Sequence, residues 1–413
     1  MAIFRPFKAY RPKPEFAAEV AAKPYDVLNS NEARREAEGH PLSFLHVGKP
    51  EIDLDPSINP YDASVYMKGK KNLTNLISQG MLAEDKEPYF YLYAQTMDGR
   101  TQYGFVGCAS VEDYWNDIIK KHENTRKDKE EDRSNHVRVT NAHTGPIFLT
   151  FRDNEEISRI IDEVKQTAPD NDHVALDGIR HTSWVISNRA LINKIQTIFS
   201  KINYLYVADG HHRTAAAGIV GRERRAANPL HRGDEEYNFF LAVVFPSSQL
   251  YIMDYNRLIK DLNGLSNEDF ITKISAYFSI EVSEQRVKSA KKGEVGMYLN
   301  GKWHRLNTKP ELLANPDPVE SLDVAILQKY VNSGILGIDD PRTSKRIDFV
   351  GGIRGLAELE RRVDSGEMQA AFAMYPTSLD ELMSIADAGK IMPPKSTWFE
   401  PKLRDGLFIH FLD

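Results

Sequence analysis

The spacing of hydrophobic positions alternates between a period of two and a period of three to four along the first half of the chain. Two β-rich runs flank Asp98-Gly99 within residues 89–110, and a second pair, Asp177-Gly178, lies between strand-like runs in residues 173–187. Such dipeptides favour the tight turns of β-hairpins, so we expect two hairpins here. Apolar residues at helical spacing predict helices over residues 155–168 and 188–199.

The remaining segments before residue 256 have weaker patterns. The four prolines among residues 2–28 exclude a long helix and indicate a short strand followed by extended chain. A Ser-Asn start and Gly39 predict a helix over residues 30–39. We expect a strand over residues 41–47, a polar helical region over 111–138, and two buried strands within 237–255.

Shorter helices and strands follow one another after residue 256. The pattern predicts helices over 268–278, 321–331, 355–363 and 378–389, a hairpin turning at Asn300-Gly301, and strands over 369–376 and 406–412. This mixture is typical of an α+β fold. We therefore predict two domains: residues 1–255, with mixed α/β structure, and residues 256–413, a smaller α+β domain.

Composition restricts the classes of function. The chain has 413 residues and a formal net charge of −6, which argues against the basic surface that nucleic-acid binding needs. Its only cysteine, Cys108, lies in an apolar run, where we expect a buried small side chain. A single cysteine excludes an internal disulfide, and no apolar run is long enough for a secretory signal or a membrane span. We expect a cytoplasmic protein with no membrane partner.

The residues Asp209-Gly210-His211-His212-Arg213 carry the clearest chemical signal. They follow an apolar run at 204–208 and precede an alanine-rich helical run at 214–220, so they are predicted to lie where a strand ends and a helix begins. The N–H groups and dipole of a helix N-terminus favour an anion, and an arginine can bind phosphate or carboxylate with two hydrogen bonds. Asp209 could orient an imidazole, hold magnesium, or act only as the helix N-cap.

Other motifs that would explain these residues are absent or incomplete. The sequence contains neither a Walker P-loop nor a dinucleotide-binding fingerprint. His211 and His212 are adjacent, so their side chains diverge and are poorly placed to chelate one metal ion. Four further polar segments, residues 23–27, 121–133, 176–181 and 392–399, carry charged side chains, and the first and last also contain prolines and aromatic residues. Each is either a solvated or structural segment or part of a site.

The chain resembles the family called domain of unknown function 1015. The stretches that carry this resemblance are RPFKAYRPKPEFAAEVAAKPYDV, PLSFLHVGKPEID, HENT…KEEDR, YVADGHHRTAAA, SGEMQAAFAMYPT and MPPKSTWFEPK…GLFIHFLD. The N-terminal part of that family is distantly similar to the ParB–sulfiredoxin superfamily, which includes a free-serine kinase that uses ADP as phosphoryl donor. The resemblance implies a ParB/sulfiredoxin-like α/β catalytic domain that binds nucleotide at the strand-to-helix turn.

At the strand-to-helix turn, the resemblance can be followed residue by residue. Gly210, His212 and Arg213 match the G-x-H-R core with which the relatives hold nucleotide phosphates, and His211 stands where sulfiredoxin has its catalytic cysteine. That difference argues against sulfinic acid reduction. The kinase relatives also use a carboxylate as general base, but no motif fixes its position here.

The resemblance implies phosphoryl transfer from ADP or ATP, with Mg²⁺, to a small hydroxylated metabolite such as a free amino acid. Gly210, Arg133, His122 and Lys395 join His212 and Arg213 as candidate phosphate ligands. The candidate catalytic residues are Asp209, which would also hold the metal, with His211, Glu123 and Asp26. A non-catalytic nucleotide sensor and a nucleotide hydrolase are the alternatives, and a homodimer is left open.

Overall fold

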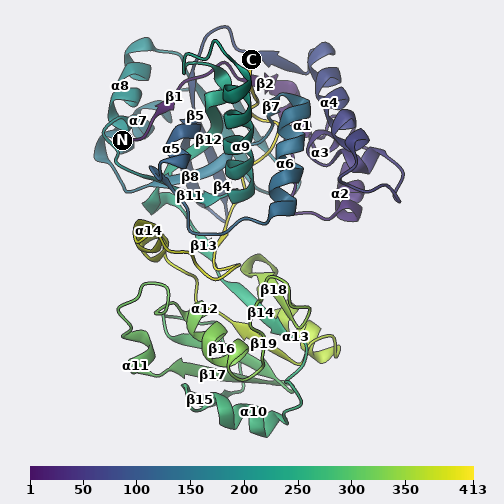
Figure 1. The fold of residues 1–413 in the computed structure, drawn as a ribbon, viewed down its shortest axis with the longest axis vertical. Coiled ribbons are helices and arrows are strands. Elements are labelled where there is room, and N and C mark those ends of the chain that lie inside the picture. The colour runs from purple at the N-terminus through teal and green to yellow at the C-terminus, as the bar shows by residue number, and fades with distance from the viewer. The chain divides into compact units, whose positions relative to one another are not determined.

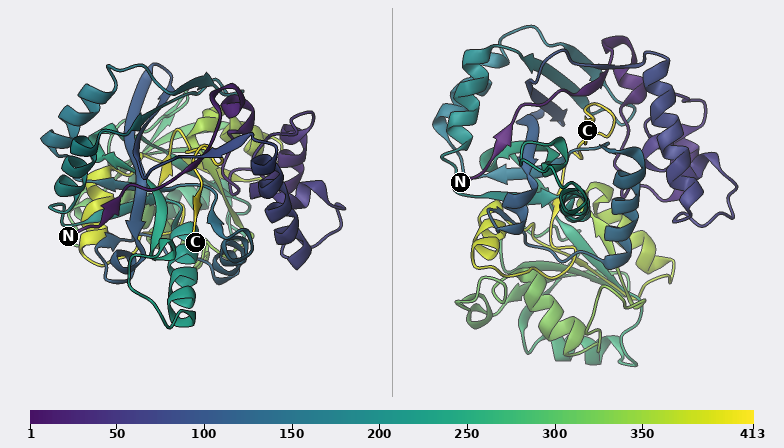
Figure 2. Two further views of the ribbon diagram at one scale, coloured as in Figure 1. Left: turned by 90° about the horizontal axis from the view of Figure 1, so that it is seen from above. Right: turned by 45° about the horizontal axis from the view of Figure 1, so that its top comes forward.

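The computed structural model describes residues 1–413, which form two compact units. The first unit contains residues 1–121, 125–250 and 401–413, and the second contains residues 122–124 and 251–400. Figure 2 shows the C-terminal segment, drawn in yellow, ending among elements of the first unit. The site described below is built within the first unit.

A nine-stranded mixed sheet forms the centre of the first unit (Figure 1). Eight of its strands follow the order β6-β11-β8-β12-β5-β4-β10-β9, and β1 pairs with β5. Two smaller pairs, β2 with β3 and β7 with β21, complete the strands of this unit. Their bounds are β1 Phe4–Arg5, β2 Tyr10–Pro12, β3 Leu82–Glu84, β4 Phe90–Met97, β5 Arg100–Ser110, β6 Ile119–Lys120, β7 Ala142–His143, β8 Ile147–Phe151, β9 Asn171–Val174, β10 Arg180–Ile186, β11 Leu205–Asp209, β12 Phe239–Pro246 and β21 His410–Phe411.

Helices pack on this sheet and beside one another. α9 lies alongside α6, and α4 contacts α6 (Figure 1). The bounds are α1 Ala17–Val20, α2 Ser30–Ala37, α3 Leu45–Gly48, α4 Ala63–Ser78, α5 Val111–Trp115, α6 Lys127–Thr140, α7 Glu155–Val164, α8 Arg189–Phe199 and α9 His211–Ala227. The apolar faces of α7 and α8 join the strands in a buried core that includes Ile160 and Ile195, which accounts for their helical spacing in the sequence.

The second unit has a six-stranded antiparallel sheet of order β15-β17-β16-β19-β14-β18 and a separate pair, β13 with β20. Its strands are β13 Ile252–Met253, β14 Tyr255–Ile259, β15 Phe278–Ser283, β16 Glu294–Leu299, β17 Lys302–Thr308, β18 Ile347–Gly351, β19 Ala370–Ala373 and β20 Trp398–Phe399. Its α-helices are α10 Asn267–Ile274, α11 Pro310–Leu313, α12 Asp323–Ile326, α13 Gly355–Asp364 and α14 Leu379–Asp387. Residues Leu327–Ser333 extend α12 as a π-helix.

The predicted α+β class is confirmed, and so are the hairpins. Asp98-Gly99 and Asn300-Gly301 all have positive φ, as a two-residue hairpin turn requires. The prediction of a strand over residues 41–47 is wrong, because Leu45–Gly48 is a short helix. Its apolar residues Phe44, Leu45 and Val47 are buried in a cluster with α4, so their hydrophobicity reflects packing of a helical turn.

Two other segments differ from the sequence prediction. The single helical region expected over residues 111–138 is instead α5, the short strand β6 and α6. The boundary between the two units lies between residues 250 and 251, whereas the sequence predicted it between residues 255 and 256. In addition, the chain returns to the first unit, to which residues 401–413 belong. This return has a clear cause, because β21 pairs with β7 and Ile409 exchanges backbone hydrogen bonds with Tyr10.

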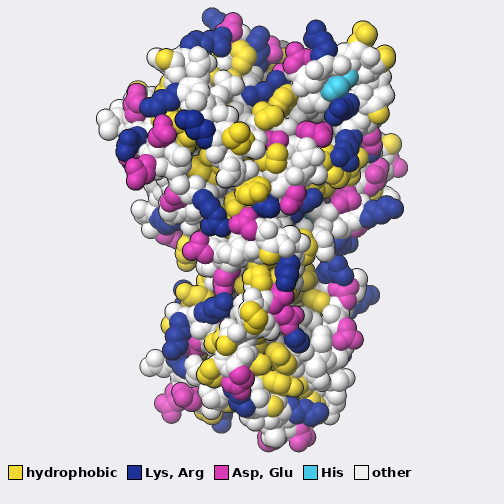
Figure 3. All heavy atoms as spheres, turned by 60° about the vertical axis from the view of Figure 1, so that its left-hand side comes forward, with side chains coloured by type: hydrophobic (Ala, Val, Ile, Leu, Met, Phe, Trp, Pro, Cys, Tyr) yellow, Lys and Arg dark blue, Asp and Glu magenta, His cyan; other side chains and the backbone are white.

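The surface and the single cysteine agree with the composition. Basic and acidic side chains are interspersed over the face shown in Figure 3, so that face presents no broad basic surface. Cys108 is fully buried in β5, as expected, and burial raises the pKa of its thiol. None of the helices combines the length and the apolar character that crossing a membrane requires.

Candidate functional site

The turn between β11 and α9 has the predicted strand-to-helix geometry. β11 ends at Asp209, Gly210 has φ 89° and ψ 31°, and the 17-residue helix α9 begins at His211. Glycine adopts this left-handed conformation without the strain that a side chain would add. Asp209 is not the helix N-cap, because Gly210 occupies that position and the backbone N–H that donates to the Asp209 carboxylate is that of Gly210, at 2.8 Å. The N-cap explanation of Asp209 is therefore wrong.

Arg213, in the first turn of α9, is held by a carboxylate near the end of the chain. Its Nη1 and Nη2 donate to Oδ1 and Oδ2 of Asp405 at 2.8 and 2.7 Å. The Asp405 side chain is only 5% exposed. Burial and the nearby Asp26 raise the pKa of Asp405, and Arg213 opposes this rise. The carboxylate thus depends on the guanidinium for its charge, and both terminal nitrogens of Arg213 are engaged in this ion pair.

Gly145 is required where this ion pair crosses the loop between β7 and β8. A Cβ at Gly145 would lie 1.9 Å from Arg213 Nη1 and 2.0 Å from Asp405 Oδ1. The charged pair therefore passes directly over a backbone that has no room for any side chain.

Gly145→Ala is expected to lower the free energy of unfolding by about 1–3 kcal/mol, because the added methyl forces the buried ion pair apart. Chemical denaturation measures the change. Gly48→Ala is a matched control, because its Cβ would meet the same carboxylate at 3.6 Å, an ordinary contact. Equal stability of the two variants would contradict the steric argument.

Asp209 forms a second ion pair with the C-terminal segment. Lys402 Nζ lies 2.6 Å from Asp209 Oδ2. Burial raises the pKa of Asp209, but Lys402 and the Gly210 N–H outweigh it, so that the pKa is lower than usual. Asp209 is consequently ionised at neutral pH, and its side chain stays 36% exposed.

These two ion pairs line one pocket, which we call the Asp209 pocket. It encloses about 340 Å³ of empty space, its open mouth included. Its lining is formed by Pro24, Asp26, Pro146, Phe148, Asp209, Gly210, Arg213, Lys402, Leu403 and Asp405. Three carboxylates therefore face two cations beside a helix N-terminus, an arrangement suited to phosphate groups that carry a metal cation.

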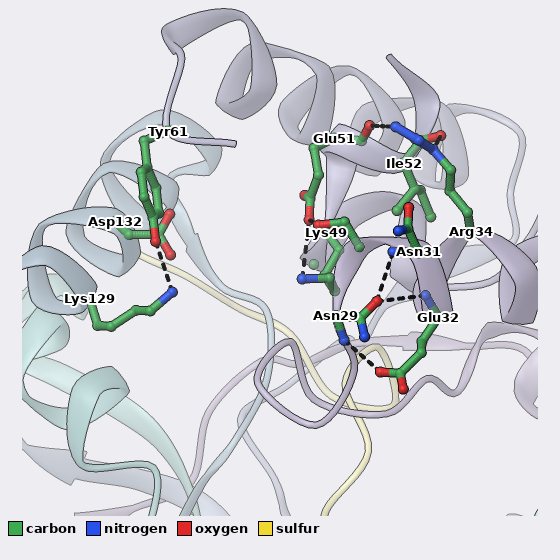
Figure 4. A network of polar contacts seen from close by, with 12 residues as sticks. Asn29, Asn31, Glu32, Arg34, Lys49, Glu51, Ile52, Tyr61, Lys129 and Asp132 are labelled. Atoms are coloured by element: carbon green, nitrogen blue, oxygen red, sulfur yellow. Dashed lines mark hydrogen bonds and ion pairs between the residues drawn. The ribbon is translucent and has the colours of Figure 1, made fainter. Parts of the chain in front are cut away.

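Asp26 reaches the pocket from a loop that is fixed on both sides. The preceding residue, Tyr25, is buried, with the guanidinium carbon of Arg133 4.0 Å from its ring centroid and that of Arg213 at 5.3 Å. After the loop, Asn29 and Glu32 form a capping box at the start of α2 (Figure 4). The loop is thus held close to Arg213 by cation–π contacts.

The two histidines of the turn differ in their surroundings. His211 is buried, and burial lowers its pKa to about 4, so this imidazole is neutral at pH 7. His212 is less buried, and its Nε2 accepts the backbone N–H of Arg126 at 3.1 Å. Neither imidazole is among the residues that line the Asp209 pocket.

Arg133 lines a second pocket that also contains Arg213 and Asp405 in its lining. We call it the His143 pocket; its empty space is about 430 Å³, its open mouth included. It is lined by Gly48, Arg133, His136, Val137, His143, Thr144, Gly145, Ile147, Arg213, Ala216, Leu241 and Asp405. Arg133 is also paired with Asp132, at 2.9 Å. The two pockets thus share Arg213 and Asp405.

The remaining candidates from the sequence belong to the second unit. His122 and Glu123 lie in residues 122–124, and the His122 carbonyl accepts the N–H of Met392 at 2.9 Å. This contact brings the segment 122–124 beside the segment that contains Lys395, whose Nζ lies 5.8 Å from the Tyr255 ring centroid. A part for His122, Glu123 and Lys395 in phosphate binding or catalysis stays a prediction.

Lys402, Asp405, Gly145 and His143 are site residues that the sequence analysis did not select. Lys402 and Asp405 come just before the apolar run of the closing strand, where a charged Lys-Leu-Arg-Asp sequence precedes Gly406. Gly406 has φ 85°, so this sequence ends in a tight turn. Such a turn was a usable signal, but nothing local to it indicates a partner near residue 209.

A family model described as Protein of unknown function (DUF1015) matches residues 4–325 of the chain. A search of curated proteins finds no match. Several solved structures are similar at low identity. A conserved hypothetical protein from Pyrococcus furiosus is 15% identical, with a TM-score of 0.35, over 71% of this chain and 93% of that one. Free serine kinase in complex with AMP is 13% identical, with a TM-score of 0.36, over 68% and 84%. C-terminally truncated SbnI from Staphylococcus aureus is 11% identical, with a TM-score of 0.39, over 74% and 87%.

Proposed function

We propose that this chain, which belongs to the DUF1015 family of proteins of unknown function, binds a nucleotide in the Asp209 pocket and transfers a phosphoryl group from it to a small hydroxylated metabolite. The observation that carries the proposal is the long helix α9, whose N-terminus adjoins a pocket with Lys402 and Arg213 in its lining. Unpaired N–H groups and the dipole of such a helix end attract phosphate oxygens.

The distribution of charge supports a nucleotide that carries magnesium. Asp405 is neutralised by Arg213 and Asp209 by Lys402, which leaves the negative charge of Asp26 in the lining. Mg²⁺ usually binds one or two carboxylates together with substrate phosphates. Asp26 and Asp209 are therefore the residues that would hold it, and the ion would neutralise charge on the phosphates.

Each residue then has a definite part in phosphoryl transfer. Lys402 would exchange its contact with Asp209 for a phosphate oxygen as the metal binds Asp209. The Gly210–His211 turn would donate backbone N–H groups, and Arg213 would fix Asp405 beneath the phosphates without giving up its own ion pair. Such positioning and charge neutralisation are the main catalytic requirements of this reaction. We place the reaction in the cytoplasm.

The two alternatives share this binding site and differ in turnover. A sensor would bind nucleotide and leave it intact, and a hydrolase would consume nucleotide without an acceptor. The proposal favours transfer to an acceptor because a second pocket shares Arg213 and Asp405 with the first.

Lys402→Met is expected to weaken binding of ADP and ATP about tenfold or more, because a charged hydrogen bond contributes about 1.5–3 kcal/mol. Calorimetry with Mg²⁺ measures binding, and ³¹P NMR with ADP, ATP or CTP and a pool of amino acids and sugars detects the phosphorylated product. Lys390→Met is the control, because Lys390 pairs with Asp317 in the second unit. Equal nucleotide affinity of the wild type and Lys402→Met would refute this assignment, and binding without any turnover would identify a sensor.

A further inference from the structure

Three side chains, beginning with His143 in the lining of the His143 pocket, form a continuous hydrogen-bonded series. His143 and His410 are opposite each other in the paired strands β7 and β21, and their Nδ1 atoms are 3.3 Å apart. His410 Nε2 lies 2.7 Å from Glu236 Oε2, and Arg5 Nη2 donates to the same oxygen at 2.6 Å. Both imidazoles are buried, with 7% and 2% exposure.

The hydrogen-bond donors and acceptors in this series determine which nitrogen of each histidine carries a proton. Arg5 and His410 lower the pKa of Glu236 against the effect of burial, so Glu236 is an ionised acceptor and His410 Nε2 must carry a proton. Burial lowers the pKa of both histidines, so each is neutral and carries one proton. His410 Nδ1 is then an acceptor, and His143 Nδ1 must donate to it.

The consequence lies at the other nitrogen of His143. Its Nε2 keeps a lone pair, is buried, and has no hydrogen-bond partner within the protein. A buried polar atom without a partner is costly, and His143 is one of the residues that line the His143 pocket. A ligand hydroxyl in that pocket would satisfy this atom.

The charges around the pocket indicate what else the ligand carries. Two guanidinium groups, those of Arg133 and Arg213, line it; Arg213 pairs with Asp405 and Arg133 pairs with Asp132. His136 also lines this pocket. Burial and then the charge of Arg133 lower the pKa of His136 to about 3, and Arg213 lowers it further. An anionic group on the ligand would contact these two guanidinium groups alongside their carboxylate partners, while its hydroxyl contacts His143.

We propose that the His143 pocket holds the phosphoryl acceptor, a small hydroxy acid or hydroxy amino acid, whose hydroxyl donates to His143 Nε2 and whose carboxylate faces Arg133 and Arg213. This inference rests on the proposed function for the source of the phosphoryl group. His143 is then the general base, in place of the carboxylates Glu123 and Asp26 suggested by the sequence.

The transfer step balances with these groups. The acceptor oxygen forms a bond to the terminal phosphorus of the nucleotide, and the bond from that phosphorus to the nucleotide's bridging oxygen breaks. The hydroxyl proton passes to His143 Nε2; burial disfavours the resulting imidazolium, and the negative charge of Glu236, acting through His410, opposes that effect. Glu236 is a positioning residue because it acts through His410.

The proton arrangement can be measured without any ligand. Long-range ¹H–¹⁵N correlation spectra of the full-length, histidine-labelled protein report which nitrogen of His143 carries the proton. We expect Nδ1–H in the wild type, and a mixture of tautomers in Glu236→Gln, whose amide can donate to His410. A wild-type His143 protonated at Nε2 would overturn the inference. If the spectrum of Glu236→Gln is identical to that of the wild type, Glu236 does not position the proton of His143.

The ligand class is tested with probes that differ by one hydroxyl. By calorimetry, the wild type should bind L-serine about tenfold more tightly than L-alanine, the effect of one hydrogen bond to an otherwise unpaired group. His143→Leu should abolish this preference, and His304→Leu, which removes a buried histidine of the second unit, should keep it.

The outcomes separate this inference from the proposed function. ADP binding without a preference for L-serine over L-alanine overturns the acceptor pocket and leaves the nucleotide site intact. A serine preference without ADP binding supports the pocket and refutes the donor site. The tautomer of the wild type remains decisive even if His143→Leu does not fold.

Discussion

Arg213→Ala is expected to lower the free energy of unfolding by about 3–5 kcal/mol, because it leaves the Asp405 carboxylate buried without its counter-ion. Asp405 is 5% exposed, and both of its oxygens accept from Arg213. Burial already raises the pKa of this carboxyl, so it would take up a proton or bring water into the site. Chemical denaturation at neutral pH measures the loss.

Two further variants decide whether the buried ion pair is the cause. Arg159→Ala breaks an exposed pair with Glu155, whose side chains are 75% and 89% exposed, and should change stability by less than about 1 kcal/mol. The double variant Arg213→Met with Asp405→Leu removes both charges together and should be more stable than Arg213→Ala alone. A double variant at least as unstable as the single one would show that packing, rather than the unpaired charge, controls stability here.

The loss of stability expected for Arg213→Ala makes this variant a poor probe of nucleotide binding. A weakened affinity in Arg213→Ala could arise from local unfolding of the Asp209 pocket, because Arg213 holds Asp405 and lies near Tyr25. Lys402 is the better probe, since its partner Asp209 stays partly exposed. Nucleotide titrations of Lys402→Met therefore report on phosphate binding with less disturbance of the fold.

Asp209→Asn is expected to lower phosphoryl transfer by about 100- to 1000-fold, the typical cost of removing one preorganised electrostatic group from an active site. The substitution keeps the size of the side chain but removes the charge that attracts Lys402 and would attract Mg²⁺. Because Asp209 does not cap α9, the helix itself should be unaffected, and the melting temperature should fall by only a few degrees.

The measurement combines turnover of the acceptor found by ³¹P NMR with calorimetric ADP binding in the presence and absence of Mg²⁺. We expect the magnesium dependence of ADP binding to disappear in Asp209→Asn. Asp172→Asn serves as the control, since it alters an ion pair with Arg180 elsewhere in the first unit. Unchanged turnover and unchanged magnesium dependence would remove Asp209 from both proposed roles.

Local chemistry made parts of this protein predictable from the sequence. Asp98-Gly99 and Asn300-Gly301 specify hairpin turns because their backbones require positive φ, which these residues adopt at little cost. The change from an apolar strand to an alanine-rich helix placed Asp209–Arg213 at a strand end. Such signals extend over a few residues, and no distant partner is needed to produce them.

The same local signals were insufficient where packing decides the structure. Residues 44–47 are as hydrophobic as a strand, yet they form a helical turn because their burial against α4 determines their conformation. Short apolar segments do not distinguish the two structures by periodicity. The N-cap assigned to Asp209 failed for a related reason: Gly210 adopts the left-handed conformation and takes that position.

The sequence by itself determined the α+β class, the principal hairpins and the strand-to-helix turn that carries Gly210 and Arg213. The tertiary structure alone decided which charges meet there. Lys402 lies 193 residues from Asp209, and Asp405 lies 192 residues from Arg213. These pairs form because β21 pairs with β7 and carries the segment 401–405 back to the turn. No local pattern encodes that pairing, because it depends on which buried surfaces fit once the rest of the chain has folded.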